Sequence, residues 1–84
     1  MSKKLVGKVM HYFDKLGVAV IELSDTLREG DQISIEGHVT NIQQSASSMQ
    51  IDRKPVDSAK KGQSIGLKTE EKVREGDKVF RVEE

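Results

Sequence analysis

Two histidines, His11 and His38, are the residues of this chain with the chemistry best suited to catalysis. A catalytic histidine needs a carboxylate that orients it, and a hydroxyl or a metal ion beside it. Asp14 is close to His11 in the sequence, but the hairpin turn expected between them does not bring the two side chains together. The carboxylates lack the spacing of a metal site, and the chain contains no cysteine. We therefore expect surface histidines, no catalytic residue, no metal ion and no cofactor, so that the chain is not an enzyme.

The tripeptide His11-Tyr12-Phe13 holds two of the three aromatic residues of the chain and lies beside Lys15 at the expected hairpin tip. In an extended strand, alternation places His11 and Phe13 on one face and Tyr12 on the other. One of the two faces must be buried, so either Tyr12 or Phe13 closes the end of the core. The other aromatic ring is then exposed for stacking or for contact with a protein partner.

The C-terminal stretch "KVFRV" raises the same question at Phe80. If Val79 faces the core, Phe80 and Val82 form an outward apolar pair, which is typical of a partner contact. The alternative is that the N-terminal residues Leu5 and Val6 cover this pair.

Basic residues form short clusters that include Arg53-Lys54 and Lys60-Lys61. Neighbouring acidic residues offset each cluster, so solvated loops are the simplest interpretation. If these four side chains converge in space, they could contact RNA phosphates, as basic loops on small barrels do.

The composition limits the classes of protein that this chain can belong to. Its 84 residues suffice for a single domain, 1–84, and 14 basic residues balance 14 acidic ones. That balance argues against independent tight binding to nucleic acid, which requires a basic excess. The lack of cysteine is typical of a cytoplasmic protein. We expect no membrane contact, because no apolar run is long enough to span a bilayer, and Gly7, Lys8 and His11 interrupt any signal peptide.

Short runs rich in β-branched residues indicate that the chain is all-β. The segment 31–37, "DQISIEG", alternates cleanly, whereas the continuous apolar run 17–23, "GVAVIEL", predicts burial on both faces. Segment 54–62, "KPVDSAKKG", predicts one turn of helix that ends at Gly62. We count six or seven short strands with close turn signals, which predicts a small closed antiparallel β-barrel.

The tetrapeptide Arg-Glu-Gly-Asp occurs twice, each time after an aliphatic residue and before an alternating stretch. A tight connection between strands often needs a residue at positive φ, which glycine adopts without steric cost. An aspartate directly after the glycine can accept hydrogen bonds from nearby backbone amides. We therefore interpret both copies as turns rather than as a charged recognition motif. The residues concerned are Gly30 with Asp31, Gly76 with Asp77, and the aliphatic anchors Leu27 and Val73.

The order of these signals resembles domain 2 of translation GTPases of the elongation factor Tu type. The resemblance rests on "GKV", "LREGD", "VREGDKVF" and an A-x-x-G-x-x-I-G-L pattern formed by Ala59, Gly62, Ile65, Gly66 and Leu67. It extends over nearly the whole chain and implies a barrel of the elongation factor domain 2 type. Stand-alone elongation-factor-like proteins, and the C-terminal barrel of collagenase-like peptidases, are also similar to this arrangement.

The chain departs from the resembled family in that it lacks the residues for nucleotide chemistry. The chain contains no G-x-x-x-x-G-K-[ST] sequence and no glycine-rich loop that opens a helix. We therefore expect no GTP binding by this chain alone. In the resembled family, the corresponding domain contacts ribosomal RNA or the acceptor end of tRNA.

The function expected from the sequence is a non-catalytic binding module linked to translation or the ribosome, which contacts RNA or a protein partner. The alternative is an accessory or substrate-presenting barrel subunit for an enzyme such as a collagenase-like peptidase. A third hypothesis is independent RNA binding. The candidate contact residues are His11, Tyr12, Lys15, Arg53, Lys54, Lys60, Lys61 and Phe80.

Overall fold

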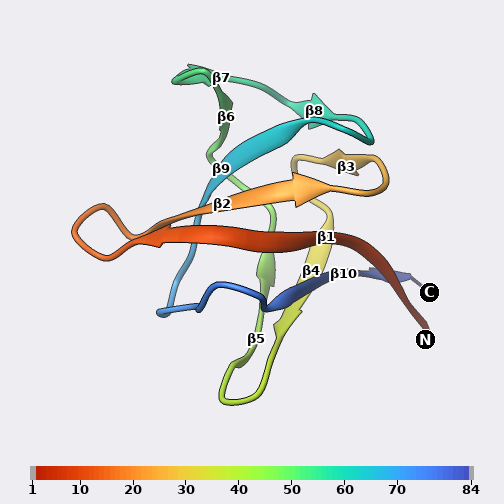
Figure 1. Cartoon of the computed structure of the whole chain (residues 1–84). Helices are drawn as coiled ribbons and strands as arrows, with labels where there is room; N and C mark the ends of the chain where they lie inside the picture. The colour runs from red at the N-terminus through yellow and green to blue at the C-terminus, as the bar shows by residue number, and fades with distance from the viewer. Residues whose placement is uncertain (1, 84) are drawn as a thin grey trace.

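The computed structural model describes residues 2–83, and all their regular structure is β (Figure 1). No helix capable of crossing a membrane occurs among these residues. The helical turn predicted for 54–62 is wrong, because this segment holds two short strands instead. The ten strands are β1 (Ser2–Phe13), β2 (Val18–Leu23), β3 (Leu27–Arg28), β4 (Gln32–Glu36), β5 (Asn41–Ser45), β6 (Met49–Ile51), β7 (Lys54–Pro55), β8 (Ser58–Ala59), β9 (Ser64–Lys68) and β10 (Lys78–Glu83).

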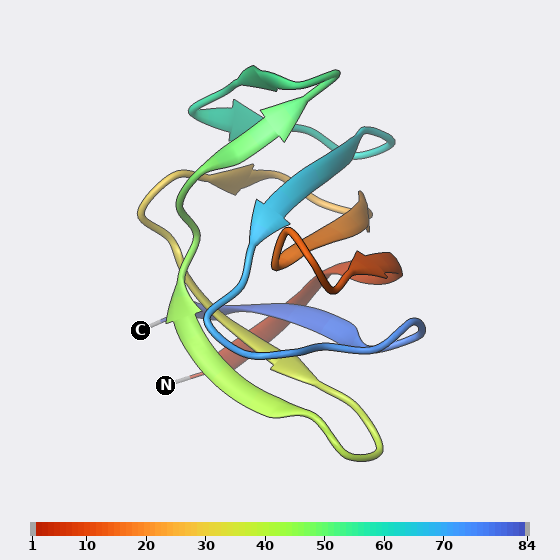
Figure 2. The same cartoon turned by 90° about the vertical axis from the view of Figure 1, so that its left-hand side faces the viewer.

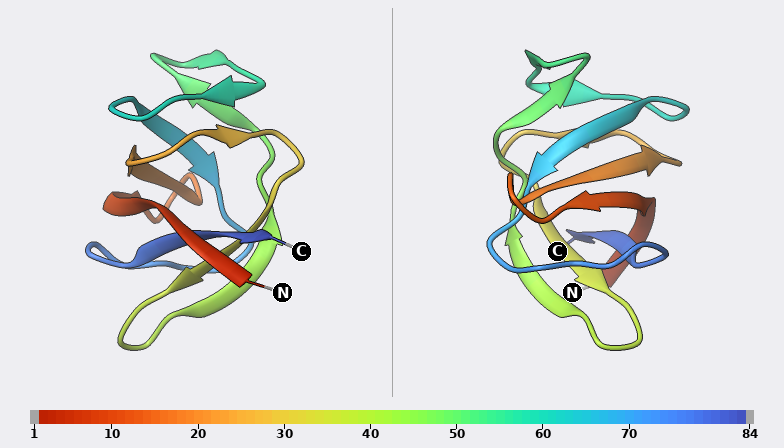
Figure 3. Two further views of the ribbon diagram at one scale, coloured as in Figure 1. Left: turned by 90° about the vertical axis from the view of Figure 1, so that its right-hand side faces the viewer. Right: turned by 60° about the vertical axis from the view of Figure 1, so that its left-hand side comes forward.

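Eight strands form one antiparallel sheet in the order β5-β4-β10-β1-β2-β9-β6-β7, and β3 pairs with β8 separately. The sheet curls strongly (Figure 2), and the connection before β6 runs across its open side (Figure 3). The expectation of a closed barrel was wrong, because β5 and β7 are the two ends of the ladder and do not pair with each other. The strand count was also too low, because β3, β7 and β8 have only two residues each. Such short strands leave no visible alternation in the sequence.

The side chain of Gln44 bridges the opening of the sheet. It projects from the edge strand β5 and is 5% exposed. Its Nε2 donates to the carbonyl of Lys68 at 3.0 Å, and its Oε1 accepts from the N–H of Glu70 at 2.9 Å. One side-chain amide thereby supplies the hydrogen bonds that a backbone ladder would otherwise make between β5 and the end of β9.

One apolar cluster fills the interior of the curled sheet. On β2, Ala19, Ile21 and Leu23 are buried, whereas Val18 and Val20 are only half-buried. The prediction that both faces of this strand are buried was wrong, because the sheet is a single layer and its outer face meets solvent. The buried apolar residues are Val6, Val9, Ala19, Ile21, Leu23, Leu27, Ile33, Ile35, Ile42, Ala46, Met49, Ala59, Ile65, Leu67, Val73 and Val79.

Three four-residue turns, 28–31, 60–63 and 74–77, share one hydrogen-bond pattern. The third residue of each is a glycine with φ of +94°, +91° and +90°, namely Gly30, Gly62 and Gly76. The N–H of the fourth residue donates to the carbonyl of the first at 3.0–3.1 Å. The side-chain oxygen of the fourth residue accepts from the N–H of the first at 2.8–2.9 Å. The fourth residue is an aspartate in both Arg-Glu-Gly-Asp copies and Gln63 in the third turn, so the third copy is not visible as a repeat.

Each of these turns docks on a residue distant in the sequence. In each turn the glycine N–H donates to the backbone carbonyl of this docking residue. The N–H of the docking residue donates back to the carbonyl of the fourth turn residue. These distances are 2.7–2.9 Å. The residue before each turn is a buried apolar anchor, Leu27, Ala59 or Val73. The turns therefore close the ends of the core. The docking residues are Ala46 for turn 28–31, Leu23 for turn 60–63 and Val9 for turn 74–77.

Candidate functional site

A register shift in β1 decides which aromatic residue of the hairpin is exposed. The pairing of β1 with β2 shifts between Val9 and His11, so Tyr12 lies opposite the buried Ala19. Tyr12 packs against the core, whereas the side chain of Phe13 points outward and is 44% exposed. The Phe13 ring lies edge-on to the His11 ring, with centroids 4.5 Å apart and an angle of 74° between the planes. This end of β1 therefore presents an aromatic pair to solvent.

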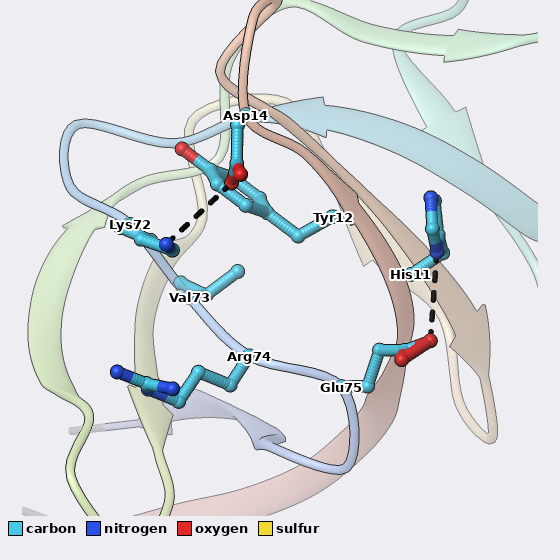
Figure 4. Close-up of a pocket in the computed structure, with 7 residues that line it drawn as sticks. All are labelled: His11, Tyr12, Asp14, Lys72, Val73, Arg74 and Glu75. Atoms are coloured by element: carbon cyan, nitrogen blue, oxygen red, sulfur yellow. Dashed lines mark hydrogen bonds and ion pairs between the residues drawn. The ribbon is translucent and has the colours of Figure 1, made fainter.

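A shallow groove separates this hairpin from the connection between β9 and β10 (Figure 4). His11, Tyr12 and Asp14 line one side, and residues 72–75 line the other. Asp14 faces Lys72 with 3.8 Å between Oδ1 and Nζ, and His11 Nδ1 lies 3.5 Å from Glu75 Oε1. The carboxylate beside His11 is therefore that of Glu75, which is distant in the sequence, and not that of Asp14. Because these four side chains are more than half exposed, both pairs contribute little to stability.

The predicted contact residue Lys15 does not line this groove and is exposed in the β1–β2 turn. The second histidine, His38, is exposed in the connection between β4 and β5, away from the groove. No group of three or more potential metal ligands occurs among residues 2–83.

The four basic residues proposed for RNA contact are divided between two turns. Arg53 and Lys54 lie at the β6–β7 turn, and Lys60 and Lys61 lie at the β8–β9 turn. All four are exposed. The two turns are at opposite ends of the upper part of the molecule in Figure 1, so these residues do not form one basic surface.

Phe80 is half-buried on the outer face of β10. Leu5 of β1 pairs with it in register, and Lys3 Nζ lies 5.7 Å from the centre of its ring. Leu5 itself is 46% exposed. Neighbouring side chains of β1 therefore partly cover Phe80, but Val6, which was also considered as a cover, is buried in the core.

Shifted pKa values occur at ion pairs away from the groove. A hydrogen bond from Lys4 holds the pKa of Asp25 below its usual value, and a hydrogen bond from Lys3 does the same for Glu36. A hydrogen bond to Glu83 raises the pKa of Arg81. Lys3 and Lys4 of β1 thereby pair with the last residue of β4 and with the segment after β2, whereas the Arg81–Glu83 pair lies within β10.

An outward surface that includes apolar side chains crosses β1, β2 and β9, which lie side by side in Figure 1. Phe13, Val18 and Lys68 form one row across these strands. His11, Val20 and Gly66 form the next row. We call these six residues the outer face. Sequence reasoning named His11 as a contact residue and left Phe13 as one of two candidates for the exposed ring. It missed Val18 and Val20, because burial of β2 on both faces was assumed, and it missed Gly66 and Lys68 on β9 as well.

No protein-family model matches the chain. It is 42% identical over 80 residues to an uncharacterized protease of Methanocaldococcus jannaschii, a match that covers 94% of this chain and 20% of that protein. It is also 42% identical over 82 residues to two collagenases of Porphyromonas gingivalis, matches that cover 95% of this chain and 23% or 20% of theirs. The chain thus spans about a fifth of the length of the curated relatives it matches.

Solved structures show the same fold in a domain that has been crystallised by itself. The C-terminal domain of a Geobacillus thermoleovorans protein assigned to the U32 peptidases superposes with a TM-score of 0.88 at 18% identity, over 95% of this chain and 93% of that one. Its selenomethionine variant gives a TM-score of 0.87 at 18% identity, over 93% of this chain and 99% of that one.

The assignment to translation was wrong. The relatives are a protease and collagenases, and the matching structures are peptidase C-terminal domains rather than elongation factor domains. The assignment relied on glycine-containing motifs such as "LREGD". The glycine in this motif is needed because the turn requires a positive φ, which is +94° at Gly30. Turns of this kind suit many small β folds and carry no information about function.

Proposed function

We propose that this chain is a non-catalytic accessory module for a collagenase-like peptidase, which binds polypeptide substrate and presents it to a separate catalytic domain. The match to protease and collagenase sequences carries the proposal. It covers at least 94% of this chain but about a fifth of each relative. The likeness to a peptidase C-terminal domain that was crystallised alone supports a module separate from the catalytic part.

The surface chemistry of the chain favours binding over catalysis. The outer face combines an exposed aromatic pair with two half-buried valines on a rigid sheet. Rigid aromatic and aliphatic groups contact a polypeptide at little cost in side-chain entropy. In contrast, the ion pairs of the groove are open to water, where a histidine and a carboxylate have little influence on each other.

A test in trans separates an accessory role from a catalytic one. The Porphyromonas gingivalis collagenase is prepared without the segment that matches this chain, and hydrolysis of fluorescently labelled gelatin is followed with and without added chain. We expect the added chain to lower KM by about threefold or more, with a smaller change in kcat, because it increases substrate binding. The chain alone should release no fluorescence.

The variant Val39→Ser is a matched control, because Val39 is an exposed apolar residue outside the outer face. It should stimulate hydrolysis as well as the natural chain does. The proposal is overturned if the chain changes neither KM nor kcat. Gelatin hydrolysis by the chain alone would also overturn it.

A further inference from the structure

Gly66 is a glycine that the fold of this chain does not require. It lies in the interior of β9, and its φ angle is not in the positive region that favours glycine. A Cβ atom placed on it would lie 3.4 Å from Val18 Cγ1 and 4.0 Å from the carbonyl oxygen of Gln50, which are ordinary contact distances. Glycine weakens a strand interior relative to alanine, and it often marks the close approach of a ligand or another backbone.

Gly7 of β1, in contrast, is a glycine that packing within the sheet requires. A Cβ atom there would lie 2.7 Å from Ile21 Cγ2 and 2.9 Å from the carbonyl oxygen of Glu22. The sheet therefore excludes a side chain at Gly7 but leaves room for one at Gly66. The bare backbone at Gly66 needs an explanation from outside the chain.

The surroundings of Gly66 are apolar on the side of β2, and we call the bare backbone at Gly66 together with Val18 and Val20 the notch. Val20 pairs with Gly66 in register, and Val18 lies close enough to contact a side chain placed there. Beyond these valines on β1 are the perpendicular rings of His11 and Phe13. A group bound at Gly66 would therefore contact bare backbone, with aliphatic side chains of β2 and aromatic side chains of β1 on one side of it.

The backbone of β2 has no hydrogen bonds to offer a partner, because β2 pairs with β1 on one side and with β9 on the other. An additional strand cannot join the sheet here. An occupant must bind through apolar contact, while its own backbone groups stay hydrogen-bonded to water. A polyproline II segment meets this condition, because proline has no N–H and the conformation has no internal hydrogen bonds. Aromatic surfaces are the usual binding sites for such segments.

Lys68 adds a charge at the end of the row that holds Phe13 and Val18. Its side chain forms no ion pair among residues 2–83. The three strands span about 10 Å at the usual strand spacing. A polyproline II segment rises about 3 Å per residue, so three or four residues cross the outer face. A carboxylate that follows the prolines would then reach Lys68.

From these observations we propose that the outer face binds an extended, proline-containing polypeptide segment, with one proline ring in the notch at Gly66 and a following carboxylate at Lys68. This inference rests on the proposed accessory function and specifies the class of polypeptide that the module takes.

The experiment titrates the ¹⁵N-labelled chain with the peptide Ac-Pro-Pro-Gly-Pro-Pro-Glu-NH₂ and follows the amide signals by NMR. We expect binding with a Kd of about 1 mM or tighter, and signal shifts centred on Gly66, Val20 and Phe13. Gly66→Val should keep the dispersed spectrum of the folded chain and weaken binding about tenfold or more, because the side chain fills the notch. Gly66→Ala should have a smaller effect, and Val39→Ser should have none.

Two further comparisons test the chemistry of the occupant. A peptide with serine in place of every proline should bind about tenfold more weakly or worse. Lys68→Glu should weaken binding of the glutamate peptide by about threefold or more, but should leave a glutamine-ended peptide unaffected. The inference is overturned if the natural chain shows no measurable binding, if the signal shifts centre on another surface, or if Gly66→Val leaves the Kd unchanged.

The failure of this inference can be distinguished from failure of the accessory function. If Gly66→Val stimulates gelatin hydrolysis as well as the natural chain does, the accessory function stands and the notch is not the binding site. If the peptide binds at Gly66 but hydrolysis is not stimulated, the inference stands and the accessory function fails.

Discussion

The carboxylate of Asp77 occupies the space that a side chain at Gly37 would need. A Cβ atom placed on Gly37 would lie 1.9 Å from Asp77 Oδ1. Asp77 is 4% exposed, and its other carboxylate oxygen accepts from the N–H of Arg74 at 2.8 Å. The connection between β4 and β5 and the last of the three glycine turns are therefore packed directly against each other. A side chain at position 37 therefore cannot be accommodated while the Asp77 carboxylate keeps its place.

Gly37→Ala should destabilise the chain by about 2–3 kcal/mol, because the new methyl group displaces the carboxylate from its hydrogen bond. Urea unfolding followed by circular dichroism measures the free energy of unfolding. In an Asp77→Ala background the same change should cost much less, since the clash is already gone. Gly66→Ala is the matched control and should not destabilise. Equal costs for Gly37→Ala in both backgrounds would contradict the proposed contact.

The three glycine turns should respond alike to substitution. Alanine at Gly30, Gly62 or Gly76 must adopt a φ near +90°, although it meets no other atom within 4 Å. Each change should therefore cost about 1–2 kcal/mol through backbone strain alone. The midpoint of urea unfolding reports the loss. A large cost at Gly30 and Gly76 with no cost at Gly62 would show that turn 60–63 is not equivalent to the other two.

Gln44→Ala should open the sheet between β5 and the end of β9. The change removes a donor to the Lys68 carbonyl and an acceptor for the Glu70 N–H. We expect a loss of about 2 kcal/mol, and faster hydrogen exchange of the Glu70 amide than of amides in β1. Ser45→Ala on the same strand is a control, because Ser45 is exposed and bonds only to Gln32 through its side chain. Unchanged exchange at Glu70 would contradict the bridging role.

The pH dependence of stability should report the ion pairs of β1. Hydrogen bonds from Lys3 and Lys4 lower the folded-state pKa of Glu36 and Asp25 below their ordinary values of 4.5 and 3.8. The stability that these carboxylates contribute is therefore present above those values and is lost as the pH falls through the lowered pKa values. Urea midpoints measured from pH 6 to pH 2 should decrease below about pH 4.5. Lys3→Met should reduce the slope, and a slope identical to that of the natural chain would contradict the Glu36 assignment.

Tyr12 and Phe13 should differ sharply in their importance for folding. Tyr12 packs against the core, whereas 44% of Phe13 is exposed. We expect Tyr12→Ser to cost about 2 kcal/mol and Phe13→Ser about 0.5 kcal/mol or less. Both values come from urea unfolding curves. If Phe13→Ser were the more destabilising change, the register shift in β1 would be incorrect.

Features that depend on neighbours in the sequence were predictable. The glycine-aspartate turns at Gly30 and Gly76 could be identified because positive φ and the side-chain acceptor lie within four residues. The alternation of β4 likewise identified Ile33 and Ile35 as core residues. Gly62 was also predicted as a structural turn residue, but as the end of a helical turn. Its equivalence to the other two turns was not recognised, because Gln63 replaces the aspartate and makes the same bond with a longer side chain.

Features of the candidate site depended on contacts distant in the sequence. His11 meets Glu75, which is 64 residues away, instead of its sequence neighbour Asp14. The outward position of Val18 and Val20 required the knowledge that no second layer covers β2. The notch at Gly66 is defined by Val18 from another strand and by the backbone of Gln50 from a third.

The sequence by itself determined that the chain is all-β and where its tight turns fall, because alternation and glycine preferences act over a few residues. Only the tertiary structure decided that the ladder stays open and is bridged by Gln44, and which aromatic ring reaches solvent. These outcomes depend on strand register and sheet curvature, which arise from packing between distant segments. A shift of one residue in β1 exchanges its two faces, and no local pattern records that shift.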